Sequence, residues 1–81
     1  MIHRFQNIYG ITYVVAASAK DIKTEMMNLV LSIIEDKKFP FTDVYVKIPN
    51  FLFQKFMEQL RESDMKYIEM EQRKDIFLLK F

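Results

Sequence analysis

Few residues in this chain are able to support acid–base or nucleophilic catalysis. Its 81 residues include one histidine, His3, and no cysteine. Such catalysis requires a nucleophile with a base beside it, or two carboxyl groups in different environments. His3 has no cysteine and no suitably spaced serine to work with, so we interpret it as a histidine on the surface or at a sheet edge. The composition therefore predicts a protein that is not an enzyme.

Metal and cofactor sites are equally hard to build from these residues. A zinc site needs several imidazole or thiolate ligands, and one histidine cannot supply them. The acidic residues that occur in pairs are Asp21 and Glu25, Glu35 and Asp36, and Glu58 and Glu62. We interpret these carboxylates as solvated faces of helices. Because phosphate-binding loops need several glycines and Gly10 is the only one, we expect neither a metal nor a cofactor.

Two strands joined by a tight turn are expected at the N-terminus. Residues 2–8 alternate weakly between polar and apolar side chains, and residues 11–17 are rich in β-branched and aromatic residues. Tyr9 and Gly10 supply the turn between them. Since residues 11–17 are mostly apolar, we predict that this second strand is buried on both faces of the sheet.

A long amphipathic helix is expected over residues 19–37. Ser18 precedes it and Asp21 follows three residues later, which is typical of a helix N-terminus. Its apolar stripe consists of Ile22, Met26, Leu29, Val30 and Ile33, and Met27, Leu31 and Ile34 widen it. The stripe is then wider than one sheet face requires. Pro40 is expected to stop the helix.

A third strand and a second helix follow. The alternating residues of the strand are Val44, Val46 and Ile48 on one side and Tyr45 and Lys47 on the other. This pattern predicts a strand with one apolar face and one mixed face. We expect Asn50 to cap a helix over residues 51–63. The apolar stripe of that helix is Phe53, Phe56, Met57 and Leu60.

The last two strands are expected over residues 65–71 and 76–81, joined by a turn around Arg73 and Lys74. Successive residues of a strand point to opposite faces of the sheet, so the direction of one side chain fixes the direction of the others in that strand. The side chains predicted to point toward the helices are Ile68, Met70, Phe77, Leu79 and Phe81. Those predicted to point away are Tyr67, Glu69, Glu71, Ile76, Leu78 and Lys80.

Residues 1–81 are therefore expected to form one compact α+β domain with the order ββαβαββ. Right-handed crossovers place both helices on one face of a mixed four- or five-stranded sheet, giving a two-layer sandwich. Without its first strand, this order resembles the topology of the C-terminal domain of translation initiation factor three and of the SirA and Alba families. The resemblance concerns topology and implies a fold, because the Cys-Pro-x-Pro segment of the SirA type cannot occur in a cysteine-free chain.

Protein binding is the function that accounts for most of these side chains. The face turned away from the helices combines aromatic, aliphatic and charged residues, as protein interfaces do. Phe51 lies off the apolar stripe of the second helix, where it either packs against Pro49 or enlarges a contact surface. The partner-binding residues that we predict are Tyr45, Lys47, Phe51, Tyr67, Glu69, Ile76 and Leu78.

The alternative is a small RNA- or DNA-binding regulator. The chain has 12 Lys and Arg against 11 Asp and Glu, and no third of it concentrates positive charge. Tyr45 and Tyr67 could stack bases, but Glu69 and Glu71 on the same face would repel phosphate. The basic residues that would contact nucleic acid are Lys20, Lys23, Lys47, Arg73 and Lys74.

Composition also bears on source and location. Phe, Tyr, Met, Ile, Asn and Lys far outnumber Gly, Ala, Arg and Pro, a bias typical of AT-rich codons in a phage or mobile element, or in an AT-rich bacterium or archaeon. The longest apolar run, residues 13–17, is too short for a membrane span, and the first residues are too polar for a signal peptide. We expect a cytoplasmic modulator or inhibitor of a host factor. A homodimer through open sheet faces or free strand edges is compatible with either function.

Overall fold

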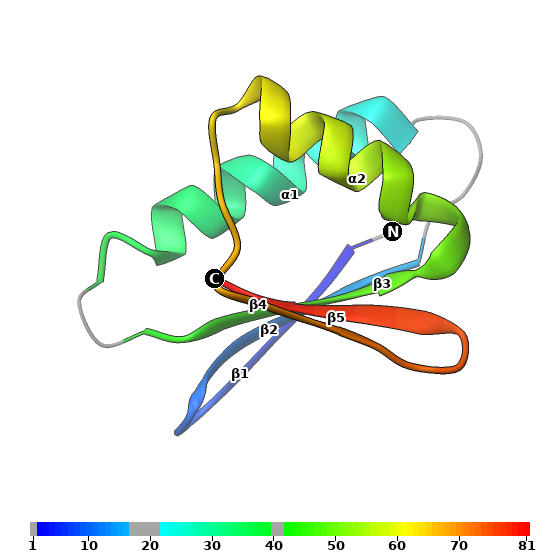
Figure 1. Ribbon diagram of the computed structural model, residues 1–81. Helices are drawn as coiled ribbons and strands as arrows, with labels where there is room; N and C mark the ends of the chain where they lie inside the picture. The colour runs from blue at the N-terminus through cyan, green and yellow to red at the C-terminus, as the bar shows by residue number, and fades with distance from the viewer. Residues whose placement is uncertain (1, 17–21, 40–41) are drawn as a thin grey trace.

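The computed structural model describes residues 2–16, 22–39 and 42–81. Its elements are β1 (Ile2–Asn7), β2 (Gly10–Val15), α1 (Ile22–Asp36), β3 (Val44–Pro49), α2 (Asn50–Glu62), β4 (Glu69–Gln72) and β5 (Ile76–Lys80). This is the predicted order ββαβαββ of an α+β fold. Both helices lie on one face of the sheet, as predicted (Figure 1). Of the described helices, neither is long and apolar enough to cross a membrane.

All five strands belong to one mixed sheet in the order β1-β2-β3-β5-β4. β2 and β3 run parallel and are connected through α1, whereas every other neighbouring pair runs antiparallel. β5 lies between β3 and β4 and is antiparallel to both, so β3 and β4 point the same way and are connected through α2. Parallel strands need a crossover connection, which each helix supplies. The sheet face opposite the helices, which we call the outer face, has no described helix over it (Figure 1).

The core lies between the sheet and the helices. Its buried side chains are Ile11, Tyr13, Val15, Met26, Leu29, Val30, Ile33, Val44, Val46, Ile48, Leu52, Phe56, Leu60, Leu79 and Phe81. The predicted apolar face of β3 and the predicted stripe of α1 are thereby confirmed. In α2 the buried residues are spaced by four, and Phe53 and Met57 are only half-buried. Phe53 lies at the side of the helix, where its ring stacks on that of Phe77 with centroids 3.7 Å apart.

β2 is buried on one face only, so the prediction of burial on both faces is wrong. Thr12 and Val14 point to the outer face and are half-buried. The reason is tertiary, because both crossover helices cover the same side of the sheet. The strand also ends at Val15, two residues before the predicted end.

α1 follows its predicted range over the described residues. It begins at Ile22 and ends at Asp36, one residue before the predicted end. The predicted cap at Ser18 and the predicted stop at Pro40 lie outside the described residues. The residues that widen the apolar stripe, Met27, Leu31 and Ile34, are exposed. The described part of the fold therefore buries only the central residues of this stripe and leaves its added residues uncovered.

The start of α2 differs from the prediction in its cap. Pro49 occupies the N-cap position, and no side chain accepts a capping hydrogen bond there. Asn50 is the first helical residue, and its backbone N–H donates to the Asp75 carbonyl at 3.1 Å. Its side-chain amide donates to the Lys74 carbonyl at 3.3 Å. Asn50 therefore links the start of α2 to the β4–β5 turn instead of capping the helix.

The last hairpin is shorter than predicted, because β4 begins only at Glu69. Alternation sets side-chain direction only within an extended strand, so it does not hold for the residues between α2 and β4. Tyr67, predicted to point away from the helices, packs against the core, and Ile68, predicted to point toward them, is exposed. Met70 lies opposite Leu79, on the predicted face. It nevertheless stays exposed, because β4 is an edge strand.

At position 10, where the turn between β1 and β2 ends, a residue larger than glycine would not fit. Gly10 has φ +148°, a backbone conformation that side chains rarely allow. A Cβ at this position would overlap the backbone carbonyl oxygen of Asp43, the oxygen that accepts the Ile11 N–H at 2.9 Å. Within the turn, the side-chain oxygen of Asn7 accepts the N–H of Tyr9 at 2.8 Å. The hairpin is therefore held against the segment that leads into β3.

We predict that Gly10→Ala lowers the free energy of unfolding by about 2 kcal/mol or more, through backbone strain and overlap with Asp43. Urea unfolding followed by circular dichroism measures the loss. Gln6→Ala, an exposed substitution on β1, is the control and should change stability by about 0.5 kcal/mol or less. Equal stability of the two variants would contradict the close approach of the hairpin to Asp43.

Candidate functional site

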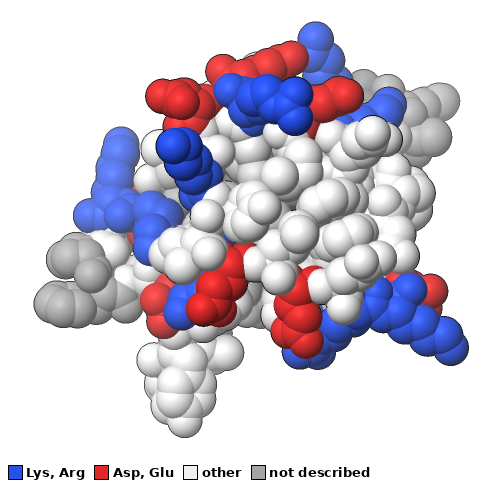
Figure 2. Space-filling view, viewed as in Figure 1, with Lys and Arg blue, Asp and Glu red and all other residues white. Residues whose placement is uncertain are grey.

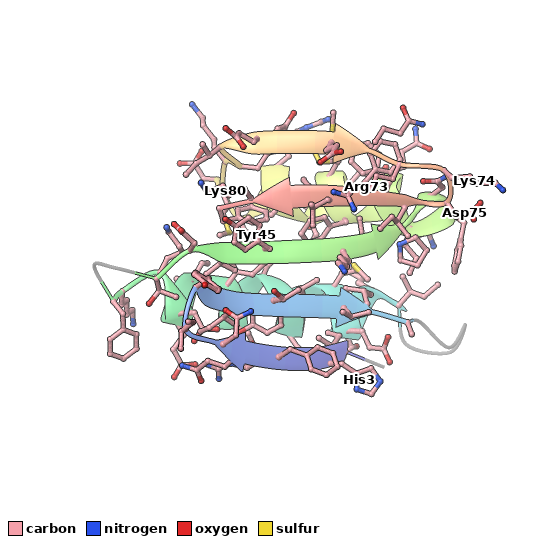
Figure 3. All side chains as sticks on the ribbon, turned by 90° about the horizontal axis from the view of Figure 1, so that it is seen from below. His3, Tyr45, Arg73, Lys74, Asp75 and Lys80 are labelled. Atoms are coloured by element: carbon pink, nitrogen blue, oxygen red, sulfur yellow. The ribbon has the colours of Figure 1, made fainter. Side chains whose placement is uncertain are left out.

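The outer face is built from two rows of side chains that cross all five strands. Residues paired across neighbouring strands direct their side chains to the same face, so the register defines each row. In the strand order β1-β2-β3-β5-β4, the first row is Phe5, Thr12, Tyr45, Lys80 and Glu69. The second row is His3, Val14, Lys47, Leu78 and Glu71. Figure 3 looks onto this face and shows Tyr45 beside Lys80.

The first row changes from apolar at β1 to charged at β4. Phe5 is 60% exposed on the edge strand. In the middle of the row, the Lys80 ammonium lies 5.9 Å from the centre of the Tyr45 ring, within range of a cation–π contact. Glu69 is paired with Lys80 from β4. The aromatic ring at the centre of the row thus has a cation beside it, and that cation has an anion on its other side.

The second row has an aliphatic centre and charged neighbours. Leu78 is half-buried on β5, between Lys47 on β3 and Glu71 on β4. The Glu71 carboxylate accepts from the Arg73 guanidinium, with N–O distances of 3.3 and 3.4 Å. His3 ends the row on β1, with its ring 6.2 Å from that of Phe5. Both rows therefore combine apolar side chains with charges of both signs.

A shallow hollow lies in the half of the outer face formed by β3, β5 and β4. The residues that line it are Tyr45, Glu69, Met70, Glu71, Leu78 and Lys80. Its apolar contribution comes from Tyr45 and Leu78, and its border is charged. Such a depression fits a side chain of another molecule more readily than it encloses a small substrate.

Most of the predicted partner-binding residues share the outer face. Those placed there are Tyr45, Lys47, Glu69, Ile76 and Leu78. Phe51 is 71% exposed on the first turn of α2, in the helix layer, and so contributes to a different surface.

Tyr67 was predicted on the outer face, and that placement is wrong. It precedes β4, is half-buried, and lines a second hollow on the helix side of the sheet together with Met57, Leu60 and Met65. Figure 2 shows a broad area of uncharged side chains between the charged residues above and below it. Tyr67 lies between α2 and β4, in a segment that belongs to no strand and bends at Ile68, and it lies beside α2 residues instead of on the outer face.

The basic residues predicted as nucleic-acid contacts are divided between two layers. Lys47 lies on the outer face, and Arg73 and Lys74 belong to the β4–β5 turn (Figure 3). Lys23 is on α1, in the helix layer on the other side of the sheet. Lys20 lies outside the described residues. The described members of this set therefore do not all share one surface.

Sequence reasoning missed the part of the outer face that β1 and β2 contribute. The structure adds Phe5, Thr12 and Val14, and it places His3 on the same face. The position of the turn could have revealed this part of the face. Asn7 pairs with Gly10, and this pair sets all the other pairs of the hairpin. A turn placed one residue earlier than predicted would have put Phe5 opposite Thr12.

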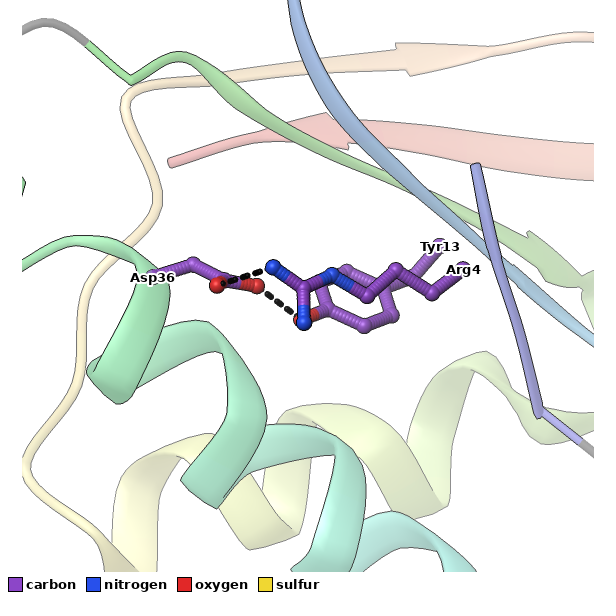
Figure 4. Close-up of polar contacts among 3 residues, drawn as sticks. All are labelled: Arg4, Tyr13 and Asp36. Atoms are coloured by element: carbon purple, nitrogen blue, oxygen red, sulfur yellow. Dashed lines mark hydrogen bonds and ion pairs between the residues drawn. The ribbon is translucent and has the colours of Figure 1, made fainter. Parts of the chain in front are cut away.

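A polar cluster around buried Asp36 lies on the helix side of the sheet, at the C-terminal end of α1 (Figure 4). Asp36 is 3% exposed, and it accepts hydrogen bonds from Arg4 Nη2 at 2.7 Å and from the Tyr13 hydroxyl. The interpretation of Asp36 as part of a solvated helix face is therefore wrong. The last turn of α1 meets the inward side chains of β1 and β2. A carboxylate is unfavourable at the negative end of a helix, and the Arg4 cation offsets it.

Burial strongly raises the pKa of the Tyr13 hydroxyl, and its hydrogen bond to Asp36 and the negative charge of Asp36 act in the same direction. The phenol therefore stays protonated and donates to the carboxylate. Among the described residues, no buried side-chain nitrogen or oxygen lacks a hydrogen-bond partner. We assign the cluster to holding β1 against α1, because its buried atoms are already satisfied by one another.

The raised pKa of Tyr13 predicts a loss of stability in alkali. Since the unfolded chain releases this proton near the ordinary pKa of about 10 and the folded chain only at higher pH, ionisation favours unfolding. The stabilisation is fully present below about pH 10 and is lost as the pH rises toward the folded pKa. Urea unfolding at a series of pH values above about 8 measures this decline.

Tyr13→Phe and Tyr9→Phe separate this effect from the titration of lysines. Tyr13→Phe should show a shallower decline of stability in alkali than the unsubstituted protein. Tyr9→Phe, which changes an exposed tyrosine, should keep the full decline. If both variants declined equally, the Tyr13 phenol would not be the group responsible.

Within the described part of the chain, no three His, Cys, Asp or Glu side chains come together in a way that could hold a metal ion.

In the comparisons with known proteins, no family model, curated protein or solved structure matches the chain.

Proposed function

We propose that this protein is a small non-enzymatic module that binds another protein through its outer face. The observation that carries the proposal is the composition of an uncovered sheet face. Phe5, Val14, Tyr45 and Leu78 lie in the two rows, and Ile76 adds to them on β5. Contiguous exposed apolar residues bordered by polar ones commonly mark interaction sites.

The charges on the same face support a protein as the partner. Each of the two lysines shares its row with a glutamate. Lys80 is paired directly with Glu69, and Lys47 is separated from Glu71 by Leu78. An apolar centre with a border of both signs is the arrangement of protein interfaces, where charges set orientation and specificity. Binding of this kind would let the chain inhibit or redirect a cytoplasmic host factor without chemistry of its own.

Nucleic acid is the less favoured partner for the same reason. Binding to a phosphate backbone requires concentrated positive charge. On the outer face, Glu69 and Glu71 lie close to Tyr45 and Lys80, the side chains that would have to contact the nucleic acid. Arg73, in the turn between β4 and β5, is itself paired with Glu71. Stacking of a base on Tyr45 would in addition displace the Lys80 ammonium from the ring.

We expect Tyr45→Ala with Leu78→Ala to weaken partner binding about thirtyfold or more, since truncating a central interface residue typically costs about 2 kcal/mol. The protein immobilised on a resin should retain a protein from a nuclease-treated lysate of its source, and the double variant should not. The matched control is Met27→Ala with Leu31→Ala, which removes exposed apolar side chains of α1 and should retain the same protein.

Circular dichroism and thermal melting show whether the double variant is folded. Because Tyr45 and Leu78 are half-buried, a second variant tests the same face without truncating them. Lys47→Glu with Lys80→Glu reverses two charges and should also abolish capture. Undiminished capture by both folded outer-face variants would place the binding surface elsewhere.

We predict that single-stranded RNA or DNA does not bind with submicromolar affinity at roughly physiological salt. Fluorescence anisotropy with labelled oligonucleotides across a salt series measures this. Tight binding with a steep salt dependence, weakened by Lys47→Ala or Lys23→Ala, would instead support the nucleic-acid function. The two positions also differ in layer, so the more sensitive one identifies the surface.

A further inference from the structure

The sheet has two edges, and they differ in how well they resist pairing with another strand. An edge strand carries unpaired N–H and C=O groups that are a template for a further strand unless charges or bends protect them. β4 is short and carries Glu69 and Glu71 among its four residues. β1 has six residues and one full charge, on Arg4. β1 is therefore the less protected edge.

The single charge on β1 is engaged within its own chain. The Arg4 guanidinium is paired with buried Asp36 at 2.7 Å, so it presents little repulsion to a second strand as long as an uncharged residue of that strand lies opposite it. The other side chains of β1 are uncharged apart from the titratable His3. Phe5 is 60% exposed and Ile8, directly after the strand, is 89% exposed. The edge thus presents free backbone groups together with uncovered apolar side chains.

We propose that β1 pairs antiparallel with β1 of a second copy, with Phe5 at the twofold axis, so that two sheets form one continuous sheet. This surface is the free edge of β1, which shares Phe5 with the outer face. The inference does not rest on the proposed function, because it is argued from the unpaired backbone and the low charge of this edge. A twofold interface uses the same patch of both copies, which a single exposed strand edge supplies.

The register follows from two constraints. An outer-face residue of one copy must pair with an outer-face residue of the other, because the helices of both copies then cover one face of the joined sheet. Two registers meet this condition with five pairs within β1. One places Arg4 opposite Arg4 of the second copy, and like charges directly opposite are unfavourable. The other places Phe5 opposite Phe5, Arg4 opposite Gln6, and His3 opposite Asn7, without any facing pair of full charges.

The favoured register also covers the exposed apolar side chains. The two Phe5 rings meet on the outer side of the joined sheet. Continuation of the register brings Ile8 of one copy beside Ile2 of the other. The same pairing at β4 is disfavoured, because both matching-face registers that form three pairs within β4 set a glutamate, Glu69 or Glu71, opposite a glutamate of the second copy. The two edges are therefore not interchangeable.

The experiment exploits the absence of cysteine from the chain. Directly opposed residues of antiparallel strands have Cα atoms about 4.5–5.5 Å apart, within the range that a disulfide spans. Phe5→Cys should therefore form a covalent dimer on mild oxidation. His3→Cys, on the same strand and the same face, is the matched control and should remain largely monomeric in gel electrophoresis without reducing agent.

Sedimentation velocity over a dilution series tests the non-covalent dimer. The unsubstituted protein should sediment as a concentration-dependent dimer, and Phe5→Glu, which sets two carboxylates at the axis, should weaken dimerisation at least tenfold while circular dichroism stays unchanged. Met70→Glu at the other edge should remain dimeric. A monomeric unsubstituted protein, a Phe5→Glu variant that dimerises normally, or equal cross-linking through His3→Cys and Phe5→Cys would overturn the proposal.

Discussion

The constraint on which this structure depends is that both crossover connections run over the same side of one sheet. β2 reaches β3 through α1, and β3 reaches β4 through α2, so every buried helix residue faces the same sheet surface. The core is therefore a single layer of side chains between sheet and helices. No described helix covers the outer face as a consequence, and the mixed composition of that face is what makes it a candidate interface.

The Arg4–Asp36–Tyr13 cluster secures the part of the sheet that the core holds least. β1 contributes only the half-buried Ile2 to the packing, so its attachment depends on pairing with β2 and on the contact of Arg4 with the end of α1. The carboxylate would be unfavourable at that position without its two donors. The contact that attaches β1 also engages its only full charge, and this leaves the strand edge nearly free of repulsion.

Charge is thus distributed differently over the three exposed parts of the sheet. β4 carries glutamates, which keep that edge separate from other strands, whereas the outer face balances Lys47 and Lys80 against the same two glutamates. β1 has no such protection. A pair of chains joined through β1 would bring the Phe5 ends of two outer faces together, so the two surfaces would act as one broad apolar and mixed-charge face.

The sequence alone determined the order of elements, the α+β class, the apolar face of β3 and the stripe of α1, because local periodicity of 2 or 3.6 residues is written directly in the order of side chains. It also determined that Tyr45, Lys47 and Leu78 share a face, since alternation holds within a strand. Only the tertiary structure decided the position of Tyr67, which lies outside any strand, and the burial of Asp36, whose partners come from β1 and β2. The joining of Phe5 and Val14 to Tyr45 likewise depends on strand pairing over long distances in the chain. Local patterns cannot show such contacts, because they arise only when segments far apart in the sequence pack together.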